Sequence, residues 1–171
     1  MATIELVNQV EEHCITPMTE HDLVEVVEIE EMCGLSRWGW DAYYEELRRG
    51  AVMLVARYNG EKSLYRWWVT GFIAARVAAA ELHINNVGVR QEFRRRGIGG
   101  ALLRAARQKG AQAGASKALL EVRASNIEAQ SLYSRHGFRV IGRRPRYYVD
   151  PPEDALIMSA VIQEAEASRQ S

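Results

Sequence analysis

The sequence predicts a mixed α/β fold in which a central, mostly antiparallel sheet is flanked by helices. The stretch from residue 51 to residue 89 is rich in β-forming runs, which favours several antiparallel strands in succession. At Ile98 the apolar residues change to the spacing of a helix, and strand and helix patterns then alternate to the end of the chain. This order favours a mixed sheet over a doubly wound nucleotide fold.

The length of the chain limits the number of domains. A chain of 171 residues can form one well-buried core and is short for two. We therefore expect a single domain over residues 1–171, with its core at about 11–162 and a frayed polar tail at 163–171.

The first half of the chain predicts two helices and four strands. A short strand begins "HCITPMTEHDLVEVVEIEEM", and a helix is expected after Thr19, with helical spacing at Leu23, Val26, Val27 and Glu30. A second short helix is expected over Asp41–Arg49, ending at Gly50. The segment "AVMLVARYNGEKSLYRWWVTGFIAARVAAAELHINNVGV" predicts three strands in succession, with a hairpin turn at "NGEK".

The second half predicts two more helices and three more strands. A core-facing helical stripe is formed by Ile98, Ala101, Leu102, Ala105 and Ala106. The segment "SNIEAQSLYSRHG" predicts a further helix, with a Ser125–Glu128 capping box and with Gly137 as its terminator. Strands are expected at "KALLEVRA", "FRVIG" and "DALIMSAVI", the last of which closes the sheet.

Charge and apolar runs restrict the partners of the chain. Its 22 basic and 22 acidic residues cancel, so the whole molecule does not attract nucleic acid or an anionic membrane. No apolar run reaches membrane-spanning length, and "MATIELVNQVEEH" lacks the order of a secretion signal, so we expect a cytoplasmic protein. Cys14 and Cys33 have neither metal-ligand spacing nor the number that a disulfide framework needs. We expect both to be buried and expect no bound metal.

The junction "QEFRRRGIGGALLRAA" predicts an anion site. A helix that opens just after glycines presents unpaired main-chain N–H groups and the positive end of its dipole. A Walker loop is excluded because no Gly-Lys-Ser/Thr follows, and a dinucleotide fingerprint is excluded because its third small residue would fall on Leu102. The remaining pattern is R-x-x-G-x-G, from Arg94 through Gly97 to Gly99, whose arginines could grip a pyrophosphate. A surface loop with solvated arginines is the alternative, and the compact strand, turn, helix, strand order favours the anion site.

At this point the sequence resembles the GNAT superfamily of N-acetyltransferases, whose acetyl-coenzyme A pyrophosphate site is an R/Q-x-x-G-x-G/A turn. The segments "NNVGVRQEFRRRGIGGALL" and "LEVRASNIEAQSLYSRHGFRVIGRRPRYY" look like the RimI-type branch, the ribosomal-protein-alanine N-acetyltransferases and their relatives, over roughly residues 50 to 160. The resemblance implies the GNAT acyl-CoA N-acyltransferase fold, with acetyl-coenzyme A as co-substrate. It also implies a protein N-terminus or peptide as acceptor, such as the N-terminal alanine of a ribosomal protein.

The resemblance also implies the residues that bind the cofactor. The strand stretch Val87–Val89 can offer main-chain groups to the amide-rich pantetheine arm, and Gly88 permits close approach. The turn after this stretch would take the pyrophosphate, and Asn126 would reach the pantetheine. A helix-start residue is the alternative role of Asn126. The full implied set is Val87, Gly88, Val89, Arg94, Arg95, Arg96, Gly97, Ile98, Gly99, Gly100 and Asn126.

Two residues are candidates for the proton transfers of acetyl transfer. Glu121 is flanked by Leu120 and Val122, so partial desolvation could raise its pKa and make it a base that acts directly or through water. The phenol of Tyr133 could protonate the departing thiolate. A solvated glutamate and a core tyrosine are the alternatives, and the resemblance assigns Glu121 as proton acceptor and Tyr133 as proton donor.

Aromatic residues are candidates for the acceptor groove. The resemblance places a peptide groove near the connection after the first helix and near the last hairpin, where Trp38, Trp40, Tyr147 and Tyr148 lie. His83 and Asn85 share a strand face with Val87 and could line the amine pocket, but we leave them out of the catalytic set.

Three other functions compete with protein N-terminal acetylation. A small-molecule amine or lysine acetyltransferase would have the same fold. A non-catalytic acetyl-coenzyme A-binding protein is disfavoured because both Glu121 and Tyr133 are retained. Nucleic-acid binding through Arg94–Arg96 and Arg143–Arg146 is disfavoured by the net charge of zero.

Overall fold

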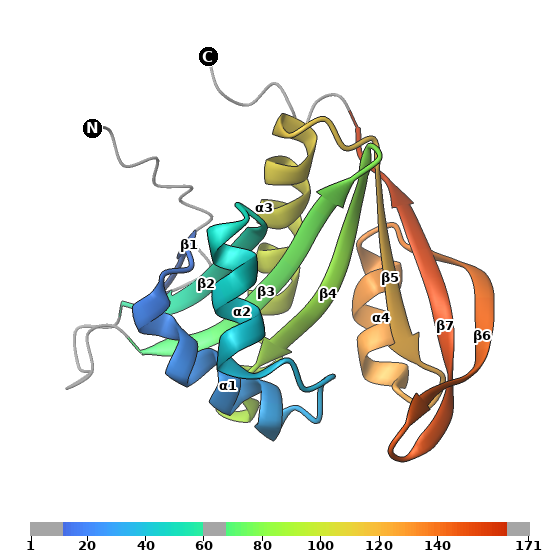
Figure 1. Cartoon of the computed structure of the whole chain (residues 1–171), viewed down its shortest axis with the longest axis horizontal. Coiled ribbons are helices and arrows are strands. Elements are labelled where there is room, and N and C mark those ends of the chain that lie inside the picture. Colours follow the sequence, from blue (N-terminus) through green and yellow to red (C-terminus); the bar gives the residue numbers. More distant parts are fainter. Residues whose placement is uncertain (1–11, 60–67, 164–171) are drawn as a thin grey trace. The chain divides into compact units, whose positions relative to one another are not determined.

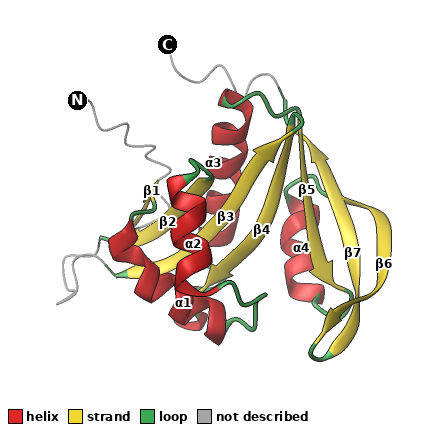
Figure 2. Cartoon of the chain, viewed as in Figure 1, coloured by secondary structure: helices red, strands yellow, loops and turns green. Residues whose placement is uncertain are grey.

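The computed structural model describes residues 12–59 and 68–163 of the chain. Helices and strands follow one another along it largely in the order that the sequence predicts (Figures 1 and 2). The predicted "NGEK" turn falls mostly outside the described residues, as does nearly all of the predicted tail. In chain order the elements are β1 (His13–Pro17), the short 3₁₀ helix η1 (Glu20–Asp22), α1 (Leu23–Met32), α2 (Gly39–Arg48), β2 (Val52–Tyr58), β3 (Val69–Ala78), β4 (Glu81–Val89), η2 (Gln91–Phe93), α3 (Ile98–Gln112), β5 (Lys117–Arg123), α4 (Ile127–Arg135), β6 (Arg139–Val149) and β7 (Pro152–Val161).

The described strands form a seven-stranded sheet in the order β1-β2-β3-β4-β5-β7-β6. β4 and β5 are parallel, whereas β1–β2, β2–β3, β5–β7 and β6–β7 pair antiparallel. The predicted mixed, mostly antiparallel sheet is thus confirmed. The last strand does not close the sheet at its border, because β7 lies between β5 and β6. The reason is that β6 and β7 form a hairpin whose second strand also pairs with β5.

The start of α4 differs from the prediction. Asn126, not Ser125, is the N-cap, and its side-chain Oδ1 accepts a hydrogen bond from the main-chain N–H of Ala129 at 3.0 Å. The predicted Ser125–Glu128 capping box is therefore wrong. Ser125 is instead held outside the helix, because its main-chain N–H donates to the Glu153 carboxylate. The predicted end is confirmed, since Gly137 takes a left-handed φ of 83° just after the helix.

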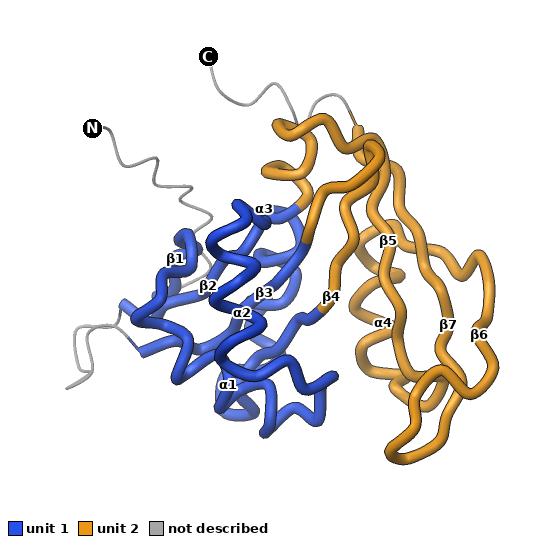
Figure 3. The backbone as a smooth tube through the Cα atoms, in the orientation of Figure 1, with its two compact units in different colours: residues 1–75, 86–106 blue, residues 76–85, 107–171 orange. Residues whose placement is uncertain are grey.

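The described chain contains two compact units, which Figure 3 colours separately. Unit 1 takes residues 1–75 and 86–106, and unit 2 takes residues 76–85 and 107–171. The single domain that the sequence predicts stays a prediction.

Unit 1 has helices on both faces of its strands. Phe72 of β3 packs on the α1 and α2 side, with its ring 5.7 Å from that of Tyr43. Gly71, the preceding residue, faces Ile98 at the start of α3, since a Cβ there would lie 3.3 Å from the Ile98 side chain. The apolar cluster under α1 and α2 comprises Met18, Leu23, Val26, Ile29, Tyr43, Met53, Val55, Val69, Phe72 and Ala74.

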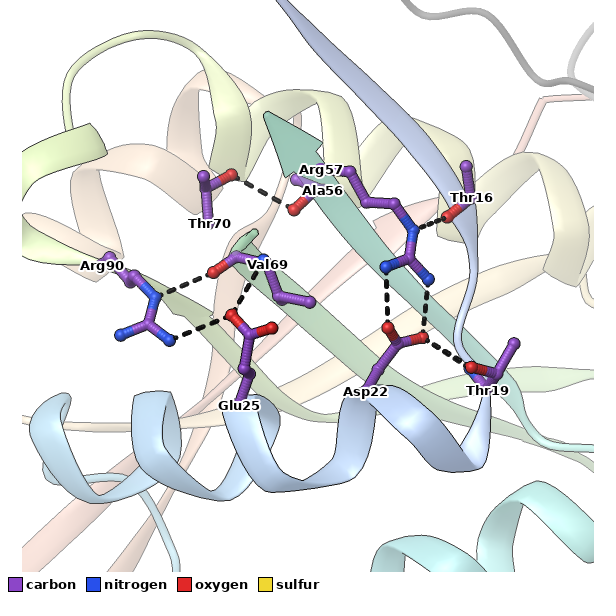
Figure 4. A network of polar contacts seen from close by, with 9 residues as sticks. All are labelled: Thr16, Thr19, Asp22, Glu25, Ala56, Arg57, Val69, Thr70 and Arg90. Atoms are coloured by element: carbon purple, nitrogen blue, oxygen red, sulfur yellow. Dashed lines mark hydrogen bonds and ion pairs between the residues drawn. The ribbon is translucent and has the colours of Figure 1, made fainter. Parts of the chain in front are cut away.

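Two arginine–carboxylate pairs fix the first helical segment of unit 1 to the strands (Figure 4). The Asp22 carboxylate pairs with Arg57 of β2 at 2.7 Å, and Arg57 also donates to Thr16 Oγ1 at 3.0 Å. Glu25 pairs with Arg90 at 3.3 Å and accepts a hydrogen bond from the Val69 N–H at 3.0 Å. These contacts set α1 against β2 and β3.

In unit 2, α4 accompanies the hairpin of β6 and β7. Tyr133 of α4 packs near Phe138, which is buried just before β6, with ring centroids 5.9 Å apart. The β6–β7 pairing is interrupted by register shifts at Val140/Gly142 and at Arg144/Tyr148. Among the strand neighbours that the structure describes, β6 has only β7.

The cysteines and the helices differ in how they meet the expectations from the sequence. Cys14 and Cys33 are only partly buried, which corrects the expectation of full burial. Cys33 lies beside polar groups, because its thiol donates to the Val89 carbonyl and the Arg94 side chain donates to its Sγ. None of the described helices is both long enough and apolar enough to cross a bilayer.

Candidate active site

The turn before α3 leads into main-chain N–H groups that have no acceptor within the helix. Arg95 and Gly97 both have left-handed φ angles, of 60° and 78°. The Gly97 carbonyl accepts the hydrogen bond from the Ala101 N–H at 3.0 Å, so the N–H groups of the intervening residues 98–100 begin the helix without an intrahelical acceptor. The helix behind them has 15 residues, and its dipole places partial positive charge at this end. The turn therefore has the properties of an anion site.

The three arginines of the turn are exposed and differ in their contacts. Arg94 points back to β4, where its Nε donates to the Val89 carbonyl at 3.1 Å. The guanidinium of Arg96 lies 5.3 Å from the ring centroid of Phe93. In the described part of the chain, no carboxylate forms an ion pair with any of the three. Their positive charge is available to a ligand.

The strand stretch Val87–Val89 lies beyond the pairing of β4 with β5. That pairing covers Glu81–Ile84 on β4 and Lys117–Leu120 on β5. Gly88 is in close contact on its α1 side, since a Cβ there would lie 2.9 Å from the Ile29 side chain. The Val89 carbonyl already accepts from Arg94 and from the Cys33 thiol.

The candidate base lies on β5 in unit 2. Glu121 is opposite Ile157 of β7, and 32% of its side chain is exposed. Its Oε1 lies 3.3 Å from Nε of Arg144, on β6. The carboxylate is thus held in a defined direction by a cation, a contact that the sequence did not indicate.

The candidate acid lies on α4 in the same unit. Tyr133 is 8% exposed, and burial, with the neighbouring Tyr148 as a second cause, raises the pKa of its phenol well above the ordinary value of 10. Among the described residues, none forms a hydrogen bond with the Tyr133 hydroxyl. Burial also raises the pKa of Tyr148 to about 12, and Glu121 is among the further causes. The charge of Glu121 therefore disfavours ionisation of Tyr148, and a charge on Tyr148 would disfavour ionisation of Tyr133.

Asn126 has the contact expected of a helix-start residue. Its Oδ1 is engaged by the Ala129 N–H, while its amide nitrogen donates to no described residue. The amide nitrogen is the group that could reach a ligand.

The four aromatic candidates lie in two different units. In unit 1, Trp38 packs on Tyr43 with ring centroids 5.4 Å apart, and Trp40 stacks on Tyr44 at 4.9 Å. In unit 2, Tyr147 is exposed, and Tyr148 lies under the Arg123 guanidinium at 4.1 Å. The cofactor residues from Val87 to Gly100 belong to unit 1, and Glu121, Asn126 and Tyr133 belong to unit 2.

Comparison with known proteins shows the family. The model of the acetyltransferase (GNAT) family matches residues 5–138. The chain belongs to this acetyltransferase family. A Bacillus subtilis (strain 168) protein, provisionally named [ribosomal protein bS18]-alanine N-acetyltransferase, is 34% identical over 149 residues, which cover 86% of this chain and 94% of that protein. An N-alpha-acetyltransferase of Sulfurisphaera tokodaii is 29% identical over 148 residues, covering 82% and 88%.

A solved structure of a related enzyme has the same fold as this acetyltransferase. The ribosomal-protein-S18-alanine N-acetyltransferase from Escherichia coli matches with a TM-score of 0.75 and 27% identity, covering 93% of this chain and 98% of that one. The resemblance to the GNAT superfamily and its ribosomal-protein-alanine branch is confirmed, and with it the fold and the interpretation as an acetyltransferase.

Several polar residues of this acetyltransferase make buried or structural contacts that the sequence patterns did not predict. Arg123 donates to the Asp150 and Pro151 carbonyls at 3.0 and 3.1 Å and fixes the β6–β7 hairpin. Glu30 is buried with Tyr43 and Asn86. A signal for Glu30 was present, because a carboxylate at a core-facing helical position requires buried partners. Among the described residues, no group of three or more His, Cys, Asp or Glu side chains could hold a metal ion.

Proposed function

We propose that the chain transfers the acetyl group of acetyl-coenzyme A to the N-terminal α-amine of a protein, such as the N-terminal alanine of a ribosomal protein. The observation that carries this proposal is the turn at the start of α3. It combines unpaired main-chain donors, a helix dipole and three exposed arginines that form no ion pair with a carboxylate of the described residues. The names of the relatives support the choice of acceptor. A ribosomal acceptor would place the enzyme in the cytoplasm.

Residues of unit 1 are proposed to bind the co-substrate. The N–H groups of residues 98–100 and the side chains of Arg95 and Arg96 would hold the pyrophosphate, because charge-assisted hydrogen bonds are the strong ones. Main-chain groups of Val87 and Gly88 would pair with the pantetheine amides in the manner of an added strand. The proposal is supported by the position of this stretch, because it lies beyond the part of β4 that pairs with β5.

Residues of unit 2 are proposed to move the protons. The amine nitrogen forms a bond to the thioester carbon while the carbon–sulfur bond breaks, so the amine loses one proton and the thiolate gains one. Glu121 accepts the amine proton, directly or through water, and Tyr133 donates to the thiolate. The Tyr133 phenol is protonated at neutral pH and so has a proton to give, and its raised pKa makes it a weaker acid than an exposed tyrosine. Solvent then reprotonates Tyr133 and takes the proton from Glu121.

The α-amine is the acceptor that places least demand on the base. Its reference pKa is about 7.7 to 8.0, against about 10.4 for lysine. At pH 7 the neutral form of the amine therefore costs about 1 kcal/mol for a protein N-terminus and about 4.6 kcal/mol for lysine. One part-exposed carboxylate suffices for the former.

The proposal is tested with peptides that begin with alanine, supplied with a free or a blocked α-amine. Transfer to the free peptide and none to the blocked one is expected, while transfer to polyamines or lysine side chains instead would identify a different acceptor. Glu121→Gln and Tyr133→Phe should each lower kcat by about 10²–10⁴-fold, the usual contribution of general acid–base catalysis, with an unchanged Kd for coenzyme A. Glu128→Gln, at an exposed position of α4, is the matched control. Unchanged turnover in Glu121→Gln would remove that residue from its role.

A further inference from the structure

Glu30 is a buried carboxylate for which the proposed chemistry has no use. It lies near the end of α1 and is 2% exposed. A carboxylate removed from water is strongly destabilising unless several donors satisfy it, and the loss of one partner is then costly. The hydrogen-bond donors to the Glu30 carboxylate therefore indicate its structural role.

The carboxylate fixes the start of α2. Its Oε1 accepts from the main-chain N–H of Trp38 at 2.7 Å, and its Oε2 accepts from that of Gly39 at 3.2 Å. Trp38 is the N-cap of α2 and provides no side-chain cap of its own. Glu30 thus supplies from α1 the cap that α2 lacks, and a negative charge at a helix start is favourable.

Two further side chains join this carboxylate to β4. The Tyr43 hydroxyl donates to Glu30 Oε1 at 2.7 Å and accepts from Asn86 Nδ2 at 2.8 Å. Asn86 also donates to the Ser36 carbonyl at 3.2 Å. Tyr43 and Asn86 are both buried. The connection between α1 and α2, residues 33–38, is therefore held at its end by Glu30 and in its middle by Asn86.

The held connection lies against the strand stretch assigned to the cofactor. A Cβ placed on Gly88 would lie 3.2 Å from Leu35 of the connection and 2.9 Å from Ile29 of α1. Asn86 and Gly88 share one face of β4, since side chains alternate along a strand. On that face Gly88 is buried under Leu35 of the connection and Ile29 of α1, so the connection packs directly on this part of the strand.

We propose that Glu30 is a positioning residue that sets the 33–38 connection, and with it Leu35 and Trp38, as the wall that selects the first residue of the acceptor. This inference rests on the proposed function. Glu30 reaches the acceptor only through the connection and has no part in the proton transfers.

Two variants with different chemistry test the inference. Glu30→Gln keeps the size of the side chain but replaces one accepting oxygen by a donor, and Tyr43→Phe removes only the shared hydroxyl. Glu31→Gln is the matched control, because 72% of that side chain is exposed and its one ion pair is long, at 3.9 Å. The assay uses peptides that are identical from the second residue and begin with alanine, serine, leucine or methionine, with kcat/KM measured for each.

The expected result is a change of at least threefold in the alanine-to-leucine ratio of kcat/KM for Glu30→Gln and Tyr43→Phe, and none for Glu31→Gln. The Kd for coenzyme A should stay within twofold of wild type, whereas general loosening of the fold would raise it together with the peptide KM and overturn the inference. A ratio that changes less than threefold in folded variants overturns it as well.

If Glu30→Gln does not fold, the result for Tyr43→Phe decides the test. A wild-type enzyme that acetylates no peptide α-amine removes the proposed function and the inference together, whereas an active enzyme with unchanged ratios removes only the inference.

Discussion

At the level of single residues, the ring of Tyr148 lies 4.1 Å below the guanidinium of Arg123 and is partly buried in the β6–β7 hairpin. Burial, followed by the neighbouring Tyr147, raises the pKa of its phenol to about 12, while Arg123 acts in the opposite direction. A charge on Tyr148 would in turn raise the pKa of Tyr133. The two phenols therefore resist ionisation together, and the neutral form is the one that the fold accommodates.

This shift predicts a loss of stability in alkali. The pKa of Tyr148 is about 12 in the folded chain and about 10 in the unfolded chain, so between these values the folded state binds more protons. The free energy of unfolding should therefore hold below pH 10 and fall as the pH rises towards 12. Urea unfolding followed by circular dichroism across this range should show a shallower fall for Tyr148→Phe than for wild type. Equal slopes for Tyr148→Phe and wild type would contradict the assignment.

At the level of elements, the turn between β3 and β4 uses an unfavourable sequence. Ala79 and Ala80 have φ angles of 49° and 61°, so both central residues of this two-residue turn are left-handed. Such turns match the twist of a hairpin but favour asparagine and glycine, because a Cβ is strained there by about 1–2 kcal/mol. The turn is therefore formed by the strands on either side of it and not by its own residues.

Relief of this strain should stabilise the protein. The double substitution Ala79→Asn and Ala80→Gly is expected to raise the free energy of unfolding by about 1 kcal/mol, after the added flexibility of glycine in the unfolded chain is subtracted. For a chain of this size that corresponds to a rise in Tm of about 2–4 °C. Thermal unfolding measures it. Ala113→Gly, next to the left-handed Gly114, should by contrast lower Tm, because it adds unfolded-state freedom without relieving strain.

At the level of the whole molecule, charge is balanced overall but not locally. The net charge is zero, yet Arg94–Arg96 form a run of exposed cations at the start of α3. Surface charges separated by more than about 8–10 Å are largely screened at physiological salt. Attraction of an anionic co-substrate must then come from the turn itself, not from the molecule as a whole.

A pair of charge reversals separates the two contributions. Arg95→Glu and Arg104→Glu change the net charge equally, but Arg104 is an exposed residue further along α3, about 9 Å from its first residue at 1.5 Å per residue. Calorimetric titration with coenzyme A should show a Kd raised by at least about tenfold for Arg95→Glu, the loss of one charge-assisted contact. Arg104→Glu should stay near wild type. Equal weakening by both variants would mean that long-range attraction dominates.

Periodicity predicted the elements of the fold because it reports burial directly. The stripe from Ile98 to Ala106 is buried in α3, and the strand runs on either side of it became β2 to β5. The order of the last strands did not follow, because pairing of β7 with both β5 and β6 depends on contacts distant in sequence. The N-cap of α4 was not predicted either, because the hydrogen bond from the Ser125 N–H to Glu153, a residue distant in sequence, holds Ser125 outside the helix.

The candidate site was predictable where a motif is local. The R-x-x-G-x-G turn is one segment, and its helix start has the geometry that the pattern indicates. The Glu30–Asn86 contact joins residues 56 positions apart, so no spacing rule reveals it. The same holds for the pairing of Glu121 with Arg144, because these residues lie on β5 and β6, two strands that β7 separates in the sheet. Roles of the individual site residues remain predictions, to be decided by the variants above.

The outer position of β6 has a consequence for behaviour at high concentration. A long border strand can act as a template on which further copies polymerise. Here the main-chain ladder is broken at two register shifts, Pro145 lacks an N–H, and four of the eleven residues are arginines. Copies of the molecule that meet along this border find an interrupted row of donors and acceptors together with like charges, and both disfavour fibril growth even in concentrated solution.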